Sequence, residues 1–116
     1  MRLNVDALTD CLAQHRDELD EYEYYGVRVI DEQLKPGDTP PNSYRWEDGS
    51  ETDEELHGAC CTDLRDGAAS VARLNEAGYY YGGHAYIIAG NAASYGEDQM
   101  ELVISDAVAI SELPAR

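Results

Sequence analysis

The sequence predicts an α+β domain in which an N-terminal helix and a second helix pack on a small, mostly antiparallel sheet. Apolar residues recur at helical spacing near the N-terminus, and short β-branched or aromatic segments follow them. Glycine and proline separate these segments. With 116 residues, of which 43% are hydrophobic, the chain is expected to form a single domain over residues 1–116.

The first helix is predicted from residue 5 to about residue 24. Its apolar face has three- and four-residue spacing and comprises Val5, Leu8, Cys11, Leu12, His15, Leu19 and Tyr22. Asn4 is a good N-cap, and Gly26 is expected to end the helix. The opposite face is rich in carboxylates, so we expect it to face solvent.

A strand is predicted next, over residues 26–32, followed by a proline-rich connection over 35–42. Residues 44–46 are expected to form a short strand. Residues 47–55 are polar, acidic and interrupted by glycine. They predict either an exposed loop or a short helix that begins near Thr52.

The second helix is predicted from residue 66 to about residue 77, where Gly78 ends it. Two strands, 79–81 and 84–89, are expected around a tight turn at Gly82 and Gly83. Residues 90–99 are predicted to be a loop. The clearest strand pattern covers 101–110, with a bend or bulge near Ser105 and Asp106.

The charge is strongly negative and unevenly distributed. Asp and Glu number 24 against 8 Lys and Arg, which gives −16. Residues 1–66 contain 18 acids and 6 bases, hence −12, and residues 67–116 contain 6 and 2, hence −4. Such a field repels nucleic acid and anionic membranes and attracts basic partners. Direct binding of nucleic acid or membrane is therefore excluded.

The same composition leaves a second explanation open. The chain has a single lysine, Lys35, against seven arginines. Few lysines with many carboxylates are typical of a housekeeping domain adapted to a salty cytoplasm. No apolar run approaches the roughly 18 residues that span a bilayer, and the N-terminus lacks the pattern of a secretory signal. The expected location is cytoplasmic.

Acidic and aromatic residues together predict a protein-binding surface. Its candidate residues are Asp17, Glu18, Glu21, Tyr22, Tyr24 and Tyr25 in or after the first helix, and Trp46, Glu51, Asp53 and Glu54 downstream. Carboxylates at helical spacing approximate a row of phosphates and attract a basic groove, while aromatic side chains supply affinity. The predicted partner is a basic nucleic-acid-binding protein.

Metal and thiol chemistry are not expected. His57 and Cys60 have a spacing found in zinc sites, but no second spaced pair follows, so no metal site is predicted. The surroundings of Cys60 and Cys61 are acidic, which disfavours a reactive thiolate.

One arrangement of residues resembles the ADP-ribosyltransferase superfamily. Arg28 lies in an early strand, Gly-Ala-Cys-Cys-Thr occupies 58–62, and Gln99-Met100-Glu101 opens a late strand. That superfamily uses an early Arg or His, a Ser-Thr-Ser-type motif and a late (E/Q)-x-E motif, although the middle motif here is Cys-Cys-Thr. The resemblance implies that Arg28 and Thr62 bind NAD and that Glu101 is catalytic, with Gln99 before it. Under this alternative the protein is an enzyme with NAD as cofactor; otherwise no catalytic residue or cofactor is expected.

A second resemblance is to small proteins of phages and other mobile elements. It rests on the stretch GGHAYIIAGNAASYGEDQMELVISDAVAI, with SYRWEDGSETDEELHG upstream. Small acidic proteins of such elements often inhibit host defence, and they include anti-CRISPR proteins that imitate the charge of DNA. The resemblance implies an inhibitor that acts by nucleic-acid mimicry.

Overall fold

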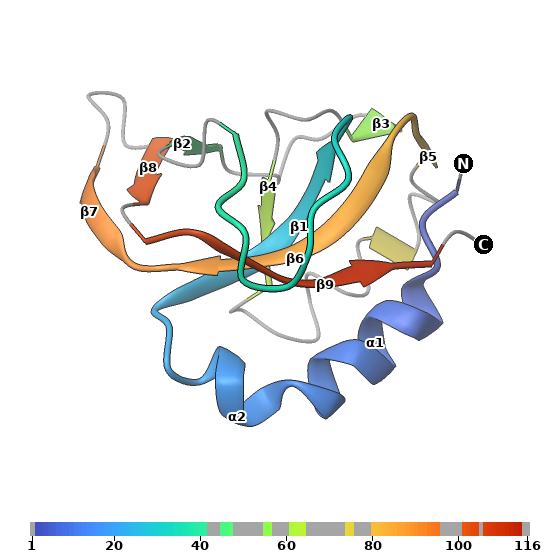
Figure 1. Ribbon diagram of the computed structural model, residues 1–116, viewed down its shortest axis with the longest axis horizontal. Helices are drawn as coiled ribbons and strands as arrows, with labels where there is room; N and C mark the ends of the chain where they lie inside the picture. The colour runs from blue at the N-terminus through green and yellow to red at the C-terminus, as the bar shows by residue number, and fades with distance from the viewer. Residues whose placement is uncertain are drawn as a thin grey trace.

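The computed structural model describes residues 2–41, 45–47, 55–56, 61–64, 74–75, 80–95, 101–104 and 106–114. Two short helices, α1 (Val5–Gln14) and α2 (Arg16–Leu19), lie on one side of an antiparallel sheet of four strands (Figure 1). The order in this sheet is β4 (Cys61–Asp63), β1 (Tyr24–Ile30), β6 (His84–Gly90) and β9 (Val108–Leu113). The α+β prediction is therefore confirmed.

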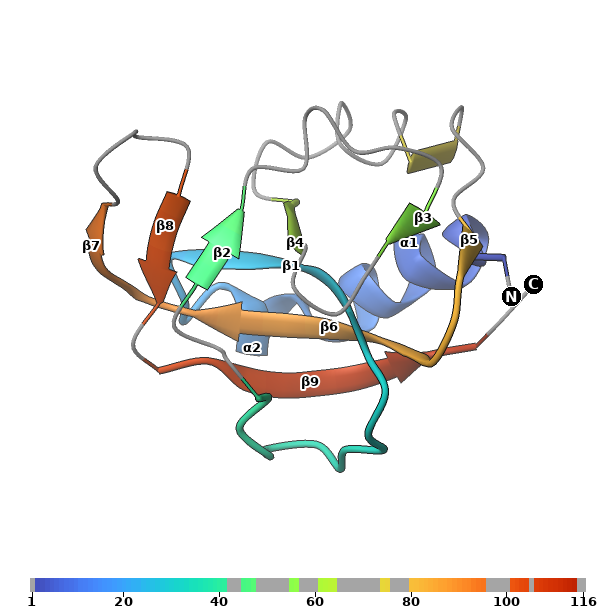
Figure 2. The ribbon, with the colours of Figure 1, turned by 90° about the horizontal axis from the view of Figure 1, so that it is seen from above.

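Two smaller sheets complete the described structure. One is antiparallel, with the order β2 (Arg45–Glu47), β8 (Glu101–Ile104) and β7 (Ala92–Tyr95). The other pairs β3 (Glu55–Leu56) with β5 (Tyr80–Tyr81) in parallel. Figure 2, seen from above, shows β7, β8 and β2 at one end of the long strands β6 and β9.

Buried side chains of the central strands point alternately to the two faces of the four-stranded sheet, so the core is divided into two clusters. Val27 and Val29 of β1 and Ile87 of β6 pack with Leu8 and Leu19 on the helical face. The opposite face holds a second cluster, composed of Ile30, Tyr86, Ile88, Ile104, Ala107 and Ala109. Side chains two residues apart share a face of a strand, so one strand supplies both clusters.

The first helix begins as predicted but ends earlier. Asn4 caps α1, because its side-chain oxygen accepts a hydrogen bond from the Ala7 N–H at 3.0 Å. Helical structure stops at Leu19, however, and Gly26 is a buried residue of β1 paired with Ile88, so the prediction of a helix to about residue 24 is wrong. Tyr22 continues the apolar spacing because it packs on the helical-face core from the turn after α2.

In the second half of the chain, long-range strand pairing explains why the observed strands differ from the predicted ones. Tyr80–Tyr81 and His84–Gly90 are strands as predicted, but β5 pairs with β3 whereas β6 pairs with β1 and β9. Residues 92–95, predicted as loop, form β7. The long strand predicted over 101–110 is two strands in different sheets, and the break falls at the predicted bend.

Other predictions lie largely outside the described residues. Leu74 and Asn75 are helical, and the remainder of the predicted second helix is not described. The strand predicted at 44–46 is confirmed as β2, shifted by one residue. None of the helices in the described part of the chain is long and apolar enough to cross a membrane.

Candidate functional site

The outer surface of α1, α2 and the turn that follows carries a dense group of carboxylates. We call this group the helical acidic face; it comprises Asp6, Asp10, Asp17, Glu18, Asp20, Glu21 and Glu23, all of them exposed. The helices form this face because Leu3, Val5, Leu8 and Leu19 bury the opposite side against the sheet. Amphipathic packing thus determines where the charge is displayed.

The charge density of this face is close to that of one strand of DNA. Residues 5–23 contain these seven acids and one base, Arg16, so their net charge is −6. At the helical rise of about 1.5 Å per residue, nineteen residues would extend over roughly 28 Å, or about 4 Å per carboxylate. A single DNA strand carries one phosphate per about 3.4 Å of helix axis.

One contact within the face involves a histidine. His15 lies between the two helices, and its Nδ1 is 3.4 Å from Glu18 Oε2. Both side chains are solvent-accessible, so the interaction is weakened by water and salt. Glu18 therefore remains available to an external cation.

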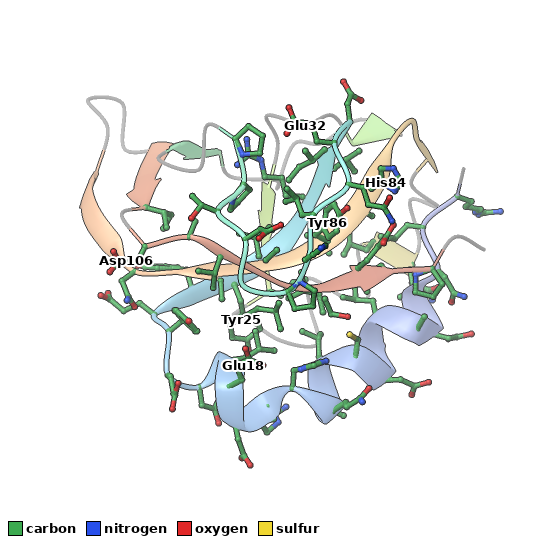
Figure 3. All side chains as sticks on the ribbon, in the orientation of Figure 1. Glu18, Tyr25, Glu32, His84, Tyr86 and Asp106 are labelled. Carbon is green, nitrogen blue, oxygen red and sulfur yellow. The ribbon has the colours of Figure 1, made fainter. Side chains whose placement is uncertain are left out.

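The tyrosines that follow α2 are placed at the margins of the core. Tyr22, Tyr24 and Tyr25 are all half-buried. Tyr22 and Tyr25 pack against the helical-face cluster, whereas Tyr24 packs against the cluster on the opposite face. Figure 3 shows Tyr25 between the helices and the sheet. Two of the three tyrosines are therefore on the same side as the helical acidic face, and the third is not.

Trp46 lies in a strand on the other side of the four-stranded sheet from the helices. Trp46 is the central residue of β2, opposite Leu102 of β8, and Figure 1 places β2 across the four-stranded sheet from the helices. Glu51, Asp53 and Glu54 lie outside the described residues. A single face that includes all of the candidates stays a prediction, and the described geometry brings together only Asp17, Glu18, Glu21, Tyr22 and Tyr25.

Carboxylates are also exposed away from the helices. Asp31, Glu32, Asp38, Asp106 and Glu112 are exposed too, so every acidic side chain whose exposure is described reaches solvent. Figure 3 shows Glu18 on the helical side, Glu32 on the opposite side and Asp106 at the end where β7 lies. Among the carboxylates whose exposure is described, the density is greatest on the helical acidic face.

A separate polar group lies on the sheet face opposite the helices. His84 Nδ1 is 2.9 Å from Glu112 Oε1, and the His84 ring is 6.3 Å from that of Tyr86. The Tyr86 hydroxyl accepts a hydrogen bond from the Leu34 N–H at 2.7 Å and donates to the Glu32 carbonyl at 3.4 Å. Sequence reasoning missed this group because its members come from different strands and from the segment after β1.

Arg28 belongs to the same sheet face. It pairs with Tyr86 on one side and Cys61 on the other, and it is only 5% exposed. Burying a guanidinium is costly unless it is paired, and Arg28 does interact within the protein. Its burial keeps it from offering its charge to a dinucleotide at the surface.

Of the other residues of the enzyme alternative, Thr62 lies beside Arg28 in the four-stranded sheet, whereas Glu101 belongs to the three-stranded sheet. Glu101 begins β8 and pairs with Glu47 of β2, in the three-stranded sheet, whereas Arg28 lies in the four-stranded sheet. Thr62 is opposite Val27 in β4. Gln99 lies outside the described residues.

The structure describes only some of the residues considered for nucleophile and metal chemistry. Cys11 is a free cysteine, half-buried against the helical-face core. No group of three or more His, Cys, Asp or Glu side chains that could hold a metal ion occurs among the residues that the structure describes. His57 and Cys60 are not among them.

Comparison with known proteins adds no relative. No protein-family model matches the chain, and neither a curated protein nor a solved structure matches it.

Proposed function

We propose that the protein is an acidic binding module whose helical acidic face docks onto a basic, nucleic-acid-handling protein. The observation that carries the proposal is the concentration of seven exposed carboxylates on two adjacent helices and the turn after them. In its most specific form, the protein is an inhibitor encoded by a mobile element and acts by imitating nucleic acid.

The spacing of charge supports imitation of a phosphate row. A groove that binds one DNA strand presents cations matched to about one phosphate per 3.4 Å, and the helical acidic face offers about one carboxylate per 4 Å. The overall net charge of −16 would also speed the encounter with a basic partner, because long-range attraction raises association rates.

The half-buried tyrosines supply the apolar part of the proposed contact. Tyr22 and Tyr25 are held against the core, so little rotamer entropy is lost when a partner covers their exposed edges. Aromatic side chains fixed beside charged ones are typical of interface centres.

The test uses the full chain as bait in a lysate of the source cell at low salt. We expect it to retain a nucleic-acid-binding protein, and duplex DNA should compete for that protein. Retention of no such protein, or of one that DNA does not displace, would contradict mimicry.

Two triple variants locate the binding surface. Asp17→Asn with Glu18→Gln and Glu21→Gln removes three charges from the helical acidic face. The matched control, Asp31→Asn with Glu32→Gln and Asp106→Asn, removes three exposed charges elsewhere. At roughly 0.2–1 kcal/mol for each exposed ion pair, the first variant should bind about 3- to 150-fold more weakly, and the control should bind almost as well as wild type.

Two further measurements, stability in dilute buffer and NAD calorimetry, separate the alternatives. A domain that is acidic only for salt adaptation predicts no partner and predicts unfolding in dilute buffer. An NAD-dependent enzyme predicts heat release when NAD is added in calorimetry. Neither alternative is favoured by an observation on the described residues.

A further inference from the structure

The segment after β1, residues 31–41, runs outside β9. We call it the strap. Figure 2 shows it leaving β1, passing the far side of β9 and returning toward β2. Because β9 is an edge strand of the four-stranded sheet, with β6 on its other side, the strap lies along an edge that the described strands leave open.

The strap forms backbone hydrogen bonds with β9, as a neighbouring strand would. The Gly37 N–H donates to the Ala109 carbonyl at 2.7 Å, and the Ala109 N–H donates to the Asp38 carbonyl at 2.8 Å. Both backbone groups of Ala109 are thereby satisfied from outside the sheet. An edge covered by a loop cannot accept another strand there.

Three features hold the strap in place. The Tyr86 hydroxyl binds the Leu34 N–H, and Leu34 packs on the apolar cluster around Ile30 and Ile88. A tight turn joins Lys35 to Asp38. The Asp38 N–H donates a hydrogen bond to the Lys35 carbonyl at 3.0 Å, and the Lys35 N–H donates one to Asp38 Oδ2 at 2.8 Å. Gly37 has φ +92°, a conformation that favours glycine.

We propose that the strap prevents a second copy of this chain from pairing through β9. This inference concerns a different surface from the helical acidic face and does not depend on the proposed function. In an antiparallel pair, two residues directly opposite each other can exchange both of their N–H···O bonds. Two copies related by a two-fold axis at Ala109 would therefore replace both strap bonds with bonds between their own Ala109 residues.

Once the strap is released, exposed apolar surface favours association of two copies, whereas their negative charge opposes it. Displacing Leu34 would expose apolar surface of the cluster that contains Ile30, Ile88 and Ala109, and burying that surface again favours association. The net charge of −16 on each copy opposes association. Because salt screens this repulsion, pairing of strap-released molecules should strengthen as ionic strength rises.

The test releases the strap without changing the charge. Gly37→Ala places a side chain at φ +92° where no atom lies within 4 Å, so its effect is on the backbone alone. Tyr86→Phe removes the hydroxyl that binds Leu34. The matched control is Gly82→Ala, which also meets open space, at an exposed glycine without a positive φ.

Hydrogen exchange at the Ala109 amide and analytical ultracentrifugation are the measurements. In the Gly37→Ala/Tyr86→Phe variant we expect Ala109 exchange about tenfold faster at low concentration, and a dimer that grows with protein and salt concentration. That dimer should restore Ala109 protection, while wild type and Gly82→Ala stay monomeric. If the double variant does not fold, Gly37→Ala alone should show the same effects more weakly.

Any of four results would overturn the proposal, of which the first three concern association. These three are a strap-released variant with fast Ala109 exchange that stays monomeric, association that leaves Ala109 unprotected, and a wild-type chain that already pairs through β9. Unchanged Ala109 exchange in both variants would also overturn it, since the strap would then not depend on the contacts that define it.

Discussion

Replacing Gly90 by alanine should destabilise the fold, because a side chain there would clash with β8 and with the connection from β8 to β9. Gly90 ends β6, immediately before the chain enters β7. A Cβ at this position would lie 2.2 Å from Ile104 Cγ2, 3.2 Å from Ala107 Cα and 3.3 Å from Ala107 N. Only a residue without a side chain fits between β6 and the connection from β8 to β9.

The size of the effect follows from these contacts. Ile104 is 1% exposed and Ala107 is 3% exposed, so neither can move into solvent. Forcing an extra methyl group into such packing costs about 1–3 kcal/mol. Alanine lowers the conformational entropy of the unfolded chain relative to glycine, and this stabilises the folded state by roughly 0.4–1 kcal/mol. With both values at mid-range, we expect a net loss of about 1.3 kcal/mol in the free energy of unfolding.

Urea denaturation followed by far-ultraviolet circular dichroism measures this loss. A double-mutant cycle with Ile104→Ala isolates its cause, because that substitution deletes the methyl group nearest the new Cβ. In the Ile104→Ala background, Gly90→Ala should cost at least about 1 kcal/mol less than in wild type. An equal cost in the two backgrounds, or no cost in wild type, would refute the packing explanation.

Two further substitutions test the placement of the helices. Leu8→Ala, at a fully buried residue of the helical-face core, should lower the free energy of unfolding by about 2–5 kcal/mol in the same urea assay, and a loss below about 1 kcal/mol would show that α1 is not packed on the sheet. Asn4→Ala should remove about 0.5–2 kcal/mol by deleting the hydrogen bond to the Ala7 N–H, whereas Asn4→Ser should retain most of the stability because serine also caps helices. Equal losses for both Asn4 variants would contradict the cap.

Local patterns in the sequence predicted the elements better than their ends. The start of α1 follows from Asn4 and from the spacing of Val5 and Leu8, which are local properties. Its end does not, since Tyr22 keeps helical spacing while the chain has already turned. Seven residues of β1 pair with β6, and this long-range pairing overrides local helix propensity.

Strand partners were the least predictable feature. The Gly82–Gly83 turn favours a hairpin, yet the two flanking strands join different sheets. Residues 101–113 form two strands because the chain crosses from the three-stranded to the four-stranded sheet at Asp106 and Ala107. Which strands pair depends on residues far apart in the sequence, and the periodicity of one segment contains no information about its pairing strand.

The sequence predicted which carboxylates of the candidate site are exposed, but it did not predict where the site's elements lie relative to one another. Exposure of Asp17, Glu18 and Glu21 follows from their position opposite the apolar side of the helices. The location of β2 across the sheet from α2 depends on topology. The contact of His84 with Glu112 joins residues 28 positions apart and has no local signal.

If position, and not total charge, makes the helical acidic face a contact surface, loss of charge there should weaken binding more than the same loss elsewhere. The most direct measurement is the affinity of the captured partner for the two triple variants, which have equal net charge. Our account predicts weaker binding for Asp17→Asn/Glu18→Gln/Glu21→Gln alone, by about 3- to 150-fold. Equal affinities for this variant and for Asp31→Asn/Glu32→Gln/Asp106→Asn would contradict it.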